Sequence, residues 1–209
     1  DEKFPKQAAF IRSPAKRKAA LCTRRSGKSY GMGSYMIHVA QTVPGCSVLY
    51  LALTRDSARN IMWKDILKTI KKKFDIAATF NETLLTMTLA NGSEIKLAGA
   101  DAKPDEMEKF LGGKYALIVI DEAGSFRQDT RKLIYENLEP AVSDYDGTIC
   151  MVGTPTSFTK GLFFDITQPD TAKRERGWEV HTWNTFDNPY MVKHWSERMA
   201  SMLELQPNL

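Results

Sequence analysis

The sequence of 209 residues has few of the features that mark specialised classes of protein. Its three cysteines are odd in number and share no metal-ligand spacing, which argues against a disulfide scaffold and indicates a reducing, intracellular setting. The central apolar run Ala116–Ile120 is far shorter than the roughly 20 residues that a membrane-spanning helix needs. Internal repeats and low-complexity linkers are also absent. The composition that remains is that of an ordinary globular protein, long enough to bury a core without staples.

Charge is unevenly distributed along the chain. Residues 1–73 contain 16 Lys and Arg against 4 Asp and Glu, whereas residues 74–209 contain 13 against 21. A basic half joined to an acidic half indicates an anionic partner such as a nucleotide or nucleic acid, although the imbalance also suits a solvated surface. The histidines His38, His181 and His194 are scattered, and we interpret them as packing or surface residues rather than ligands.

Short apolar runs rich in β-branched residues alternate with longer amphipathic stretches, which is typical of a parallel sheet covered by helices. Strands are expected at Ala19–Cys22, Ser47–Ala52, Leu117–Asp121, Thr148–Gly153 and Glu179–Trp183. Helices are expected at Lys28–Gln41, Asp56–Phe74, Asp129–Val142 and Met191–Leu203. The dipeptide Asn91-Gly92 within residues 83–99 predicts an antiparallel hairpin. The predicted fold class is therefore α/β, a doubly wound three-layer sandwich with a mostly parallel central sheet and a β-hairpin insertion.

The segment Cys22–Ser29 has the sequence context of a phosphate-binding loop, because it follows an apolar strand and opens an amphipathic helix. Free backbone N–H groups at a helix start can cradle phosphates, and Gly27 lets the backbone approach them closely. Lys28 would then reach the β- and γ-phosphates, and the Ser29 hydroxyl would bind Mg²⁺. Cys22 stands where the usual pattern has its first glycine, and a Gly-Lys-Ser tripeptide also arises by chance.

A pair of carboxylates follows the apolar strand that ends at Ile120. A buried strand would deliver Asp121 to the carboxyl edge of the sheet, where ligands of open α/β folds bind. Asp121 is expected to hold Mg²⁺ opposite Ser29, directly or through water. Glu122 is expected to orient and deprotonate the water that attacks the γ-phosphorus. The alternative is a strand that merely ends at a charged turn.

Together these motifs resemble the ATPase domain of the large terminase subunit, the DNA-packaging motor of tailed bacteriophages. Two further segments carry the resemblance. Val152–Pro155 is similar to the coupling motif of that family, and Phe4–Gln7 is similar to its adenine-reading Gln motif. The resemblance spans nearly the whole chain, and it implies a RecA-like P-loop NTPase fold of the ASCE type that uses ATP and Mg²⁺.

The resemblance implies a role for each matching residue. Gln7 would bind the adenine edge with Phe4 packed nearby, although Phe4 would serve equally in an arm that covers the sheet edge. Arg24 would be the loop arginine that responds to the γ-phosphate, and spacing does not rank it firmly over Arg25. Thr154 would sense the γ-phosphate, unless it is an ordinary strand-end turn. The expected nucleotide-binding residues are Phe4, Gln7, Arg25, Ser26, Gly27, Lys28, Ser29, Tyr30 and Thr154; the expected catalytic residues are Glu122, Arg24 and Lys28, and the metal ligands Ser29 and Asp121.

The chain departs from the family pattern in two places. Leu111 stands where family members commonly carry an arginine that acts on the neighbouring subunit. Its candidate substitutes are Lys109, Lys114, Arg127 and Arg131. The 54 residues after Pro155 are too few for the RNase H-like nuclease domain of the family, so we expect no nuclease activity. Residues 1–185 are expected to form the ATPase domain, and residues 186–209 a lid or linker toward a nuclease domain.

A packaging motor needs a sequence-independent grip on DNA phosphates. Arg55 follows a predicted strand at a suitable place, and the next helix carries a basic face that equally suits solvent exposure: Lys64, Lys68, Lys71, Lys72 and Lys73. Apolar residues form a stripe on the same helix: Ala58, Ile61, Met62, Ile66, Leu67 and Ile70.

The expected function is ATP hydrolysis that powers translocation of double-stranded viral DNA into a procapsid, in the cytoplasm of the host. The resemblance implies a homo-oligomeric ring on a portal, with the small terminase subunit as a further partner; the isolated chain would be a monomer. One alternative is a superfamily 2 helicase-like translocase, which would need a second RecA-like core. The other is an ATP-dependent DNA-binding switch that does not hydrolyse ATP.

Overall fold

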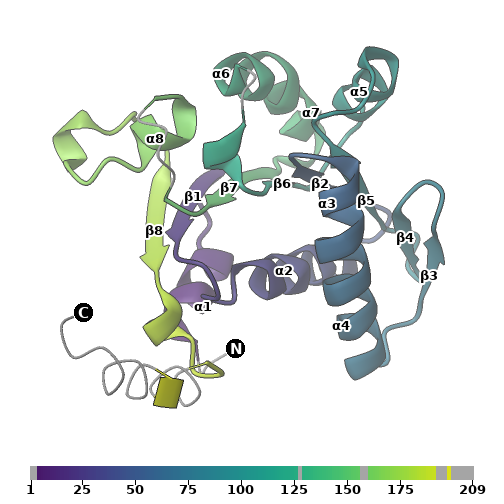
Figure 1. Cartoon of the computed structure of the whole chain (residues 1–209). Coiled ribbons are helices and arrows are strands. Elements are labelled where there is room, and N and C mark those ends of the chain that lie inside the picture. The colour runs from purple at the N-terminus through teal and green to yellow at the C-terminus, as the bar shows by residue number, and fades with distance from the viewer. Residues whose placement is uncertain (1–3, 127–128, 156–159, 192–196, 199–209) are drawn as a thin grey trace.

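A computed structural model describes residues 4–126, 129–155, 160–191 and 197–198 (Figure 1). An eight-stranded sheet lies at its centre, in the order β3-β4-β5-β2-β6-β7-β1-β8. The strands are β1 (Arg17–Cys22), β2 (Ser47–Ala52), β3 (Ala78–Asn81), β4 (Thr86–Leu89), β5 (Glu94–Gly99), β6 (Leu117–Ile120), β7 (Thr148–Gly153) and β8 (Glu179–Trp183). The six strands from β5 to β8 in this order run parallel to one another. Strand β4 runs antiparallel to both of its neighbours, β3 and β5. Because β6, β7 and β1 are adjacent and parallel, the segments that follow these three strands lie close together at one edge of the sheet.

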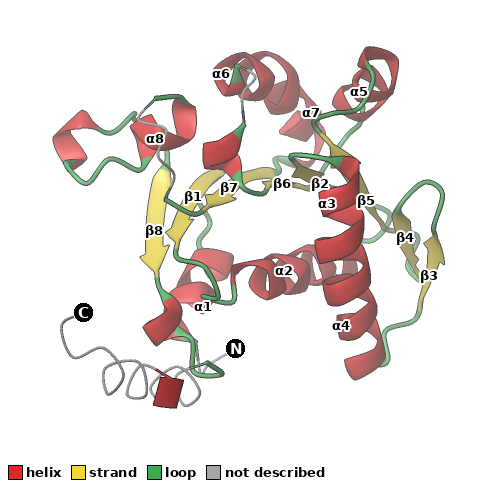
Figure 2. Cartoon of the chain, viewed as in Figure 1, coloured by secondary structure: helices red, strands yellow, loops and turns green. Residues whose placement is uncertain are grey.

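Helices cover both faces of the sheet (Figure 2). One face carries α1 (Pro5–Arg12), α2 (Lys28–Thr42) and a continuous helix made of α3 (Arg55–Ser57), the π-helical segment η1 (Ala58–Leu67) and α4 (Lys68–Lys73). The other face carries α5 (Pro104–Leu111), α6 (Thr130–Lys132), the π-helical η3 (Leu133–Leu138), α7 (Glu139–Val142) and α8 (Leu162–Ile166). Short 3₁₀ turns complete the connections: η2 (Ala123–Ser125), η4 (Ser143–Tyr145), η5 (Thr171–Lys173) and η6 (Thr185–Asp187).

Alternation along the strands explains the three layers. In β2, Val48 and Tyr50 point toward α2 and η1, whereas Leu49 and Leu51 point toward η3 and α7. All four side chains are at most 1% exposed. Strands apolar on both sides are what a sheet buried between two helical layers requires. The predicted three-layer α/β architecture is therefore confirmed, and so are its five strands and first three helices, with shifts of up to two residues at their ends.

The predicted hairpin is also confirmed. Its loop is longer than the two-residue loop that the dipeptide Asn91-Gly92 favours, and one of its strands is also part of the parallel sheet. The Gly92 N–H donates to Leu89 O at 3.0 Å and the Leu89 N–H donates to Ser93 O at 2.9 Å, which encloses three loop residues rather than two. Gly92 takes φ +83°, the left-handed conformation that such a loop needs at its last position. Beyond the turn, β5 pairs with β2, so one arm of the hairpin belongs to the parallel sheet itself.

The predicted apolar stripe on the helix after β2 is partly wrong. Ile61 is 44% exposed, and Trp63 is fully buried in its place. The cause is the π-helical winding of η1, which adds a residue to each turn, so that buried residues recur at intervals of four and five: Ala58, Met62, Trp63 and Leu67. A stripe drawn at 3.6 residues per turn therefore drifts out of phase.

Four elements were not predicted from the sequence: α1, β3, α5 and α8. The first of these is held by a buried lysine from β1. Lys18 Nζ donates to Phe10 O at 2.9 Å and to Ser13 O at 3.0 Å, at the C-terminal end of α1. Burial lowers the pKa of Lys18. The expected helix Met191–Leu203 lies almost wholly outside the described residues.

The cysteines and histidines have the surroundings described next. Cys22, Cys46 and Cys150 are buried free thiols, and burial raises the pKa of Cys22 and of Cys150 to about 12. His181 packs edge-on against the ring of Phe10, 5.2 Å between centroids, as a packing residue would. His38 is exposed, and His194 lies outside the described residues. Within the parts of the chain that the structure describes, no helix is both long and apolar enough to cross a bilayer.

Candidate nucleotide-binding site

The loop between β1 and α2 has the geometry of an anion-binding turn. Gly27 and Arg25 take left-handed conformations, with φ +79° and φ +59°. The backbone N–H groups of Arg24 to Lys28 have no hydrogen-bond acceptor among the described residues. Successive free N–H groups in a turn that alternates between right- and left-handed residues form a concave site for anions. The loop therefore fits a phosphate chain, although Cys22 replaces the usual first glycine.

Lys28 lies against the acidic pair at the end of β6. Its Nζ is 3.1 Å from Asp121 Oδ1 and 2.6 Å from Glu122 Oε1. Burial alone would lower the pKa of Lys28, but the charges of Asp121 and Glu122 outweigh burial and raise it. The sequence predicts that the lysine and the carboxylates belong to one site. In the structure their side chains are in contact, although strand β7 lies between the strands β1 and β6 that they follow.

Asp121 is fixed by its neighbours. Its Oδ2 accepts a hydrogen bond of 2.6 Å from the Tyr50 hydroxyl, and its Oδ1 accepts one of 2.8 Å from the Glu122 N–H. Burial and the adjacent carboxylate raise the pKa of Tyr50 well above its usual range, so the phenol stays protonated and donates. Asp121 is 3% exposed, so its orientation depends on these partners.

Glu122 takes a left-handed conformation, with φ +53° and ψ +39°. A non-glycine residue rarely adopts this conformation, and it aims the carboxylate back across the sheet edge. Glu122 Oε2 accepts a hydrogen bond of 3.2 Å from the Thr154 hydroxyl, at the end of β7. The side chain is 40% exposed, in contrast to that of Asp121. The arrangement leaves one carboxylate fixed and the other accessible.

These groups surround a cavity of about 540 Å³. Its walls are residues 23–30 together with Ile66, Glu122, Thr154, Asn188 and Met191. The predicted residues Arg25, Ser26, Ser29 and Tyr30 are all among them. The volume lies within the usual range for small-ligand sites.

Two of the predicted residues, Gln7 and Phe4, do not line this cavity. Gln7 is buried, and its Nε2 donates to Gly27 O at 3.1 Å, so it contacts the loop and does not line the cavity. Phe4 packs edge-on against Trp183, 6.3 Å between ring centroids, behind the loop. Arg24 and Arg25 are both exposed, and neither guanidinium has a partner among the described residues. The structure therefore leaves the order of the two arginines open.

Sequence reasoning missed the contribution of β8 and η6. Trp183, Thr185 and Asn188 all donate side-chain hydrogen bonds to carbonyl groups of the phosphate-binding loop. Tyr50 was missed as well. No local pattern announces such residues, because each acts across more than 70 positions of sequence.

The cationic candidates for a trans-acting residue differ in their surroundings. Lys114 pairs with Asp144, and Arg131 pairs with both Asp165 and Glu175. These pairs already neutralise the two charges. Lys109 is exposed on α5, in the turn before Leu111, which ends the helix. Arg127 lies outside the described residues.

The predicted basic helix carries charges in two kinds of environment. Lys68 pairs with Glu82 and lies 5.9 Å from the centroid of the Trp63 ring. Lys73 lies 5.8 Å from the ring of Tyr30. The guanidinium of Arg55 donates to the carbonyl of Thr83, which ties it to the β3–β4 connection. Lys71 and Lys72 have no partner among the described residues and are the charges most available for an external anion.

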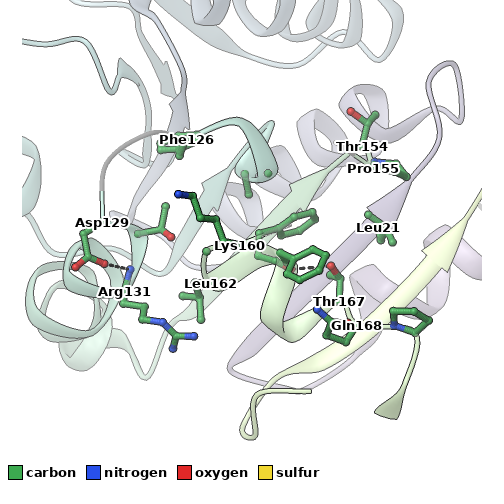
Figure 3. Close-up of a pocket in the computed structure, with 17 residues that line it drawn as sticks. Leu21, Phe126, Asp129, Arg131, Thr154, Pro155, Lys160, Leu162, Thr167 and Gln168 are labelled. Carbon is green, nitrogen blue, oxygen red and sulfur yellow. Dashed lines mark hydrogen bonds between the residues drawn. The ribbon is translucent and has the colours of Figure 1, made fainter. Parts of the chain in front are cut away.

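A second cavity of about 260 Å³ lies beside the first, between η2, α6 and α8 (Figure 3). Thr154 lines both cavities. Lys160 projects between Phe126 and Leu162 in this view. Thr154, which contacts Glu122 at the end of the strand, therefore lies between the first cavity and this second cavity.

The sheet order, the loop after β1 and the acidic pair after β6 define a P-loop NTPase fold of the RecA-like type. No protein-family model and no curated protein matches the sequence.

Solved structures do match, among them structures of phage large terminases. The large terminase ATPase domain of Thermus phage P74-26 superimposes with a TM-score of 0.71 at 19% identity, over 100% of this chain and 91% of that one. The large terminase of another thermophilic bacteriophage, in complex with ATP-gamma-S, gives 0.70 at 17% identity, over 93% of this chain and 48% of that one. The HK97 large terminase gives 0.64 at 17% identity, over 87% and 38%. The chain therefore has the fold of a large-terminase ATPase domain.

Proposed function

We propose that this chain is an ATPase that powers the translocation of double-stranded viral DNA into a procapsid. The observation that carries the proposal is the contact of Lys28 with Asp121 and Glu122 beside a loop of free N–H groups. ATP hydrolysis requires these groups together: donors for the phosphates, a metal ligand and a base for water. The terminase fold of the chain supports the choice of DNA packaging among the functions of P-loop ATPases.

The donor set fits Mg²⁺ bound together with ATP. Among the described residues no three His, Cys, Asp or Glu side chains cluster as a metal site. The phosphates of ATP and water would supply the other ligands of the ion. Ser29 and Asp121 would hold the ion, since Mg²⁺ binds through one or two protein oxygens plus substrate phosphates. When bound, Mg²⁺ neutralises charge on the phosphates. The Tyr50 hydroxyl keeps Asp121 oriented for that role.

The remaining residues act on the phosphates and the water. Lys28 would contact the β- and γ-phosphates, and Arg24 or Arg25 would contact the γ-phosphate as its charge grows. Glu122 would hold and deprotonate the attacking water, and its contact with Thr154 would pass the state of the γ-phosphate to the strand end. Gln7 would bind the adenine edge through the part of its amide that the loop does not use.

Partners and domain limits follow from the same proposal. Residues 1–185 would form the ATPase domain and residues 186–209 a lid or linker toward a nuclease domain. Basic residues such as Lys71 and Lys72 would contact the DNA backbone without reading bases. The chain would work as a ring on a portal with a small terminase subunit, in the host cytoplasm.

A comparison of phosphate release with and without linear duplex DNA tests this function. We expect the purified chain to release phosphate from ATP, and duplex DNA of any sequence to raise the rate. ATP-dependent DNA binding without phosphate release would instead favour the non-hydrolysing switch. The observation that supports this alternative is that Lys28 is already engaged in ion pairs. Strand separation of a forked duplex would favour the helicase-like alternative.

Replacing Tyr50 by Phe should raise the Mg²⁺ concentration that the ATPase requires. The change removes only the hydroxyl that donates to Asp121, and loss of such supporting hydrogen bonds typically costs about 10- to 100-fold in metal affinity. The measurement is the Mg²⁺ concentration that gives half-maximal phosphate release. Tyr115→Phe is the matched control, because its buried hydroxyl donates to Phe110 O on the opposite face. An unchanged Mg²⁺ requirement in Tyr50→Phe would remove Tyr50 from the site.

A further inference from the structure

Four consecutive carbonyl groups of the phosphate-binding loop are each held from outside by a side chain. Thr185 Oγ1 donates to Arg24 O at 2.7 Å, and Asn188 Nδ2 donates to Arg25 O at 3.1 Å. The next two carbonyls are those of Ser26 and Gly27: Trp183 Nε1 donates to the first and Gln7 Nε2 to the second, both at 3.1 Å. We name these donors the carbonyl clamp: Gln7, Trp183, Thr185 and Asn188.

The clamp fixes the direction of the loop N–H groups. In a trans peptide the C=O of one residue and the N–H of the next point in opposite directions within one plane. Holding the carbonyls of residues 24–27 outward therefore turns the N–H groups of residues 25–28 inward. Those four N–H groups are among the ones that have no acceptor among the described residues. The clamp thus accounts for the free donors of the anion site.

The clamp also accounts for the strained conformation of the loop. Arg25 has φ +59°, which is unfavourable for a residue with a side chain, and its carbonyl is held by Asn188. Asn188 is 5% exposed, and its Oδ1 in turn accepts the Tyr190 N–H at 3.1 Å. A buried amide with partners on both sides has little freedom to move. The surrounding structure therefore imposes the conformation that the loop sequence alone does not favour.

We propose that the carbonyl clamp preorganises this loop for the phosphate chain, so that its members are positioning residues for phosphate binding. The inference rests on the proposed function, since it concerns the same nucleotide. It assigns Gln7 a role in phosphate binding that is independent of the base. It also makes β8 and η6 part of the nucleotide site, because three of the four donors come from this segment.

Binding of tripolyphosphate and of ATP, each measured by calorimetry, separates this role from others. Asn188→Ala and Thr185→Val each remove one donor, and each should weaken both ligands by the same factor, about five- to tenfold. Gln7→Ala should weaken tripolyphosphate as well, whereas a residue that only reads adenine would weaken ATP alone. Asn91→Ala is the matched control, because its amide donates to Ala40 O at 2.8 Å, far from the loop. It should lower thermal stability and leave both affinities unchanged.

Specific outcomes would overturn the inference. Wild-type affinity for tripolyphosphate in both Asn188→Ala and Thr185→Val would do so, as would an equal loss of affinity in Asn91→Ala. If Asn188→Ala fails to fold, Thr185→Val and Gln7→Ala serve for the same comparison, since each removes one donor and adds no charge. A wild-type chain that binds neither ligand would refute the proposed function itself, whereas tight binding by every variant would refute the clamp alone.

Discussion

Replacing Glu122 by Gln is expected to lower the rate of ATP hydrolysis by about 100- to 10,000-fold, the usual contribution of a general base. The amide keeps the shape of the side chain and its reach toward Thr154, but it cannot accept the proton of the attacking water. Because Lys28 and the loop N–H groups are unchanged, ATP should still bind. Steady-state phosphate release and a separate measurement of ATP affinity give the two numbers.

The control for this variant should remove a carboxylate elsewhere. Glu136→Gln serves as this control, since Glu136 is exposed on η3 and forms only a long ion pair with Lys132, at 4.0 Å. It should hydrolyse ATP at the rate of the unchanged protein. Turnover by Glu122→Gln at that same rate would show that another group activates the water. Loss of binding together with turnover would show that Glu122 organises the site and does not act as a base.

The parts of the site that could be predicted are those written in consecutive residues. The loop Cys22–Ser29 and the pair Asp121-Glu122 each follow an apolar strand, and parallel strands deliver such segments to one edge of a sheet. Their meeting in space was therefore predictable, and the contact of Lys28 with both carboxylates agrees with it. The strands themselves were found for the same reason, because apolar residues on both sides of a strand indicate burial between helices.

The parts that could not be predicted depend on single hydrogen bonds between distant segments. Asn188 and Arg25 are separated by 163 positions, and Tyr50 and Asp121 by 71. A lone Asn or Tyr gives no sign of its partner, so only the folded chain reveals these contacts. The exposed Ile61 has a different cause, since helical periodicity at 3.6 residues per turn does not anticipate π-helical winding.

The left-handed conformation of Glu122 could not be read from the sequence either. The sequence predicts different roles for Asp121 and Glu122 but not their surroundings, which the structure shows to be opposite. Asp121 is almost fully buried with three donors on its oxygens, and Glu122 is partly exposed. This difference suits the proposed roles of Asp121 as a fixed metal ligand and of Glu122 as the base that accepts a proton from water.

Replacing Lys28 by Ala should affect both ligand binding and the stability of the fold. A charge-assisted contact to phosphate contributes about 1.5–3 kcal/mol, so ATP affinity should fall by about 10- to 150-fold. In the ligand-free protein the same change leaves the buried Asp121 without its cationic partner. Breaking a buried ion pair in this way typically costs about 3–5 kcal/mol of unfolding free energy. Calorimetry with ATP and urea unfolding measure the two effects separately.

The double variant Lys28→Ala/Asp121→Asn distinguishes the two consequences, because a neutral amide at position 121 no longer needs a cation. It should regain most of the lost stability and still bind ATP weakly. The pH dependence gives an independent check. The pKa of Lys28 is raised in the folded state, so its pairing stabilises the fold fully below the unfolded pKa, near 10.5, and is lost as the pH rises through the folded value. Lys28→Ala should lack this part of the alkaline loss of stability. Undiminished ATP affinity in Lys28→Ala would contradict the phosphate-binding role of the loop.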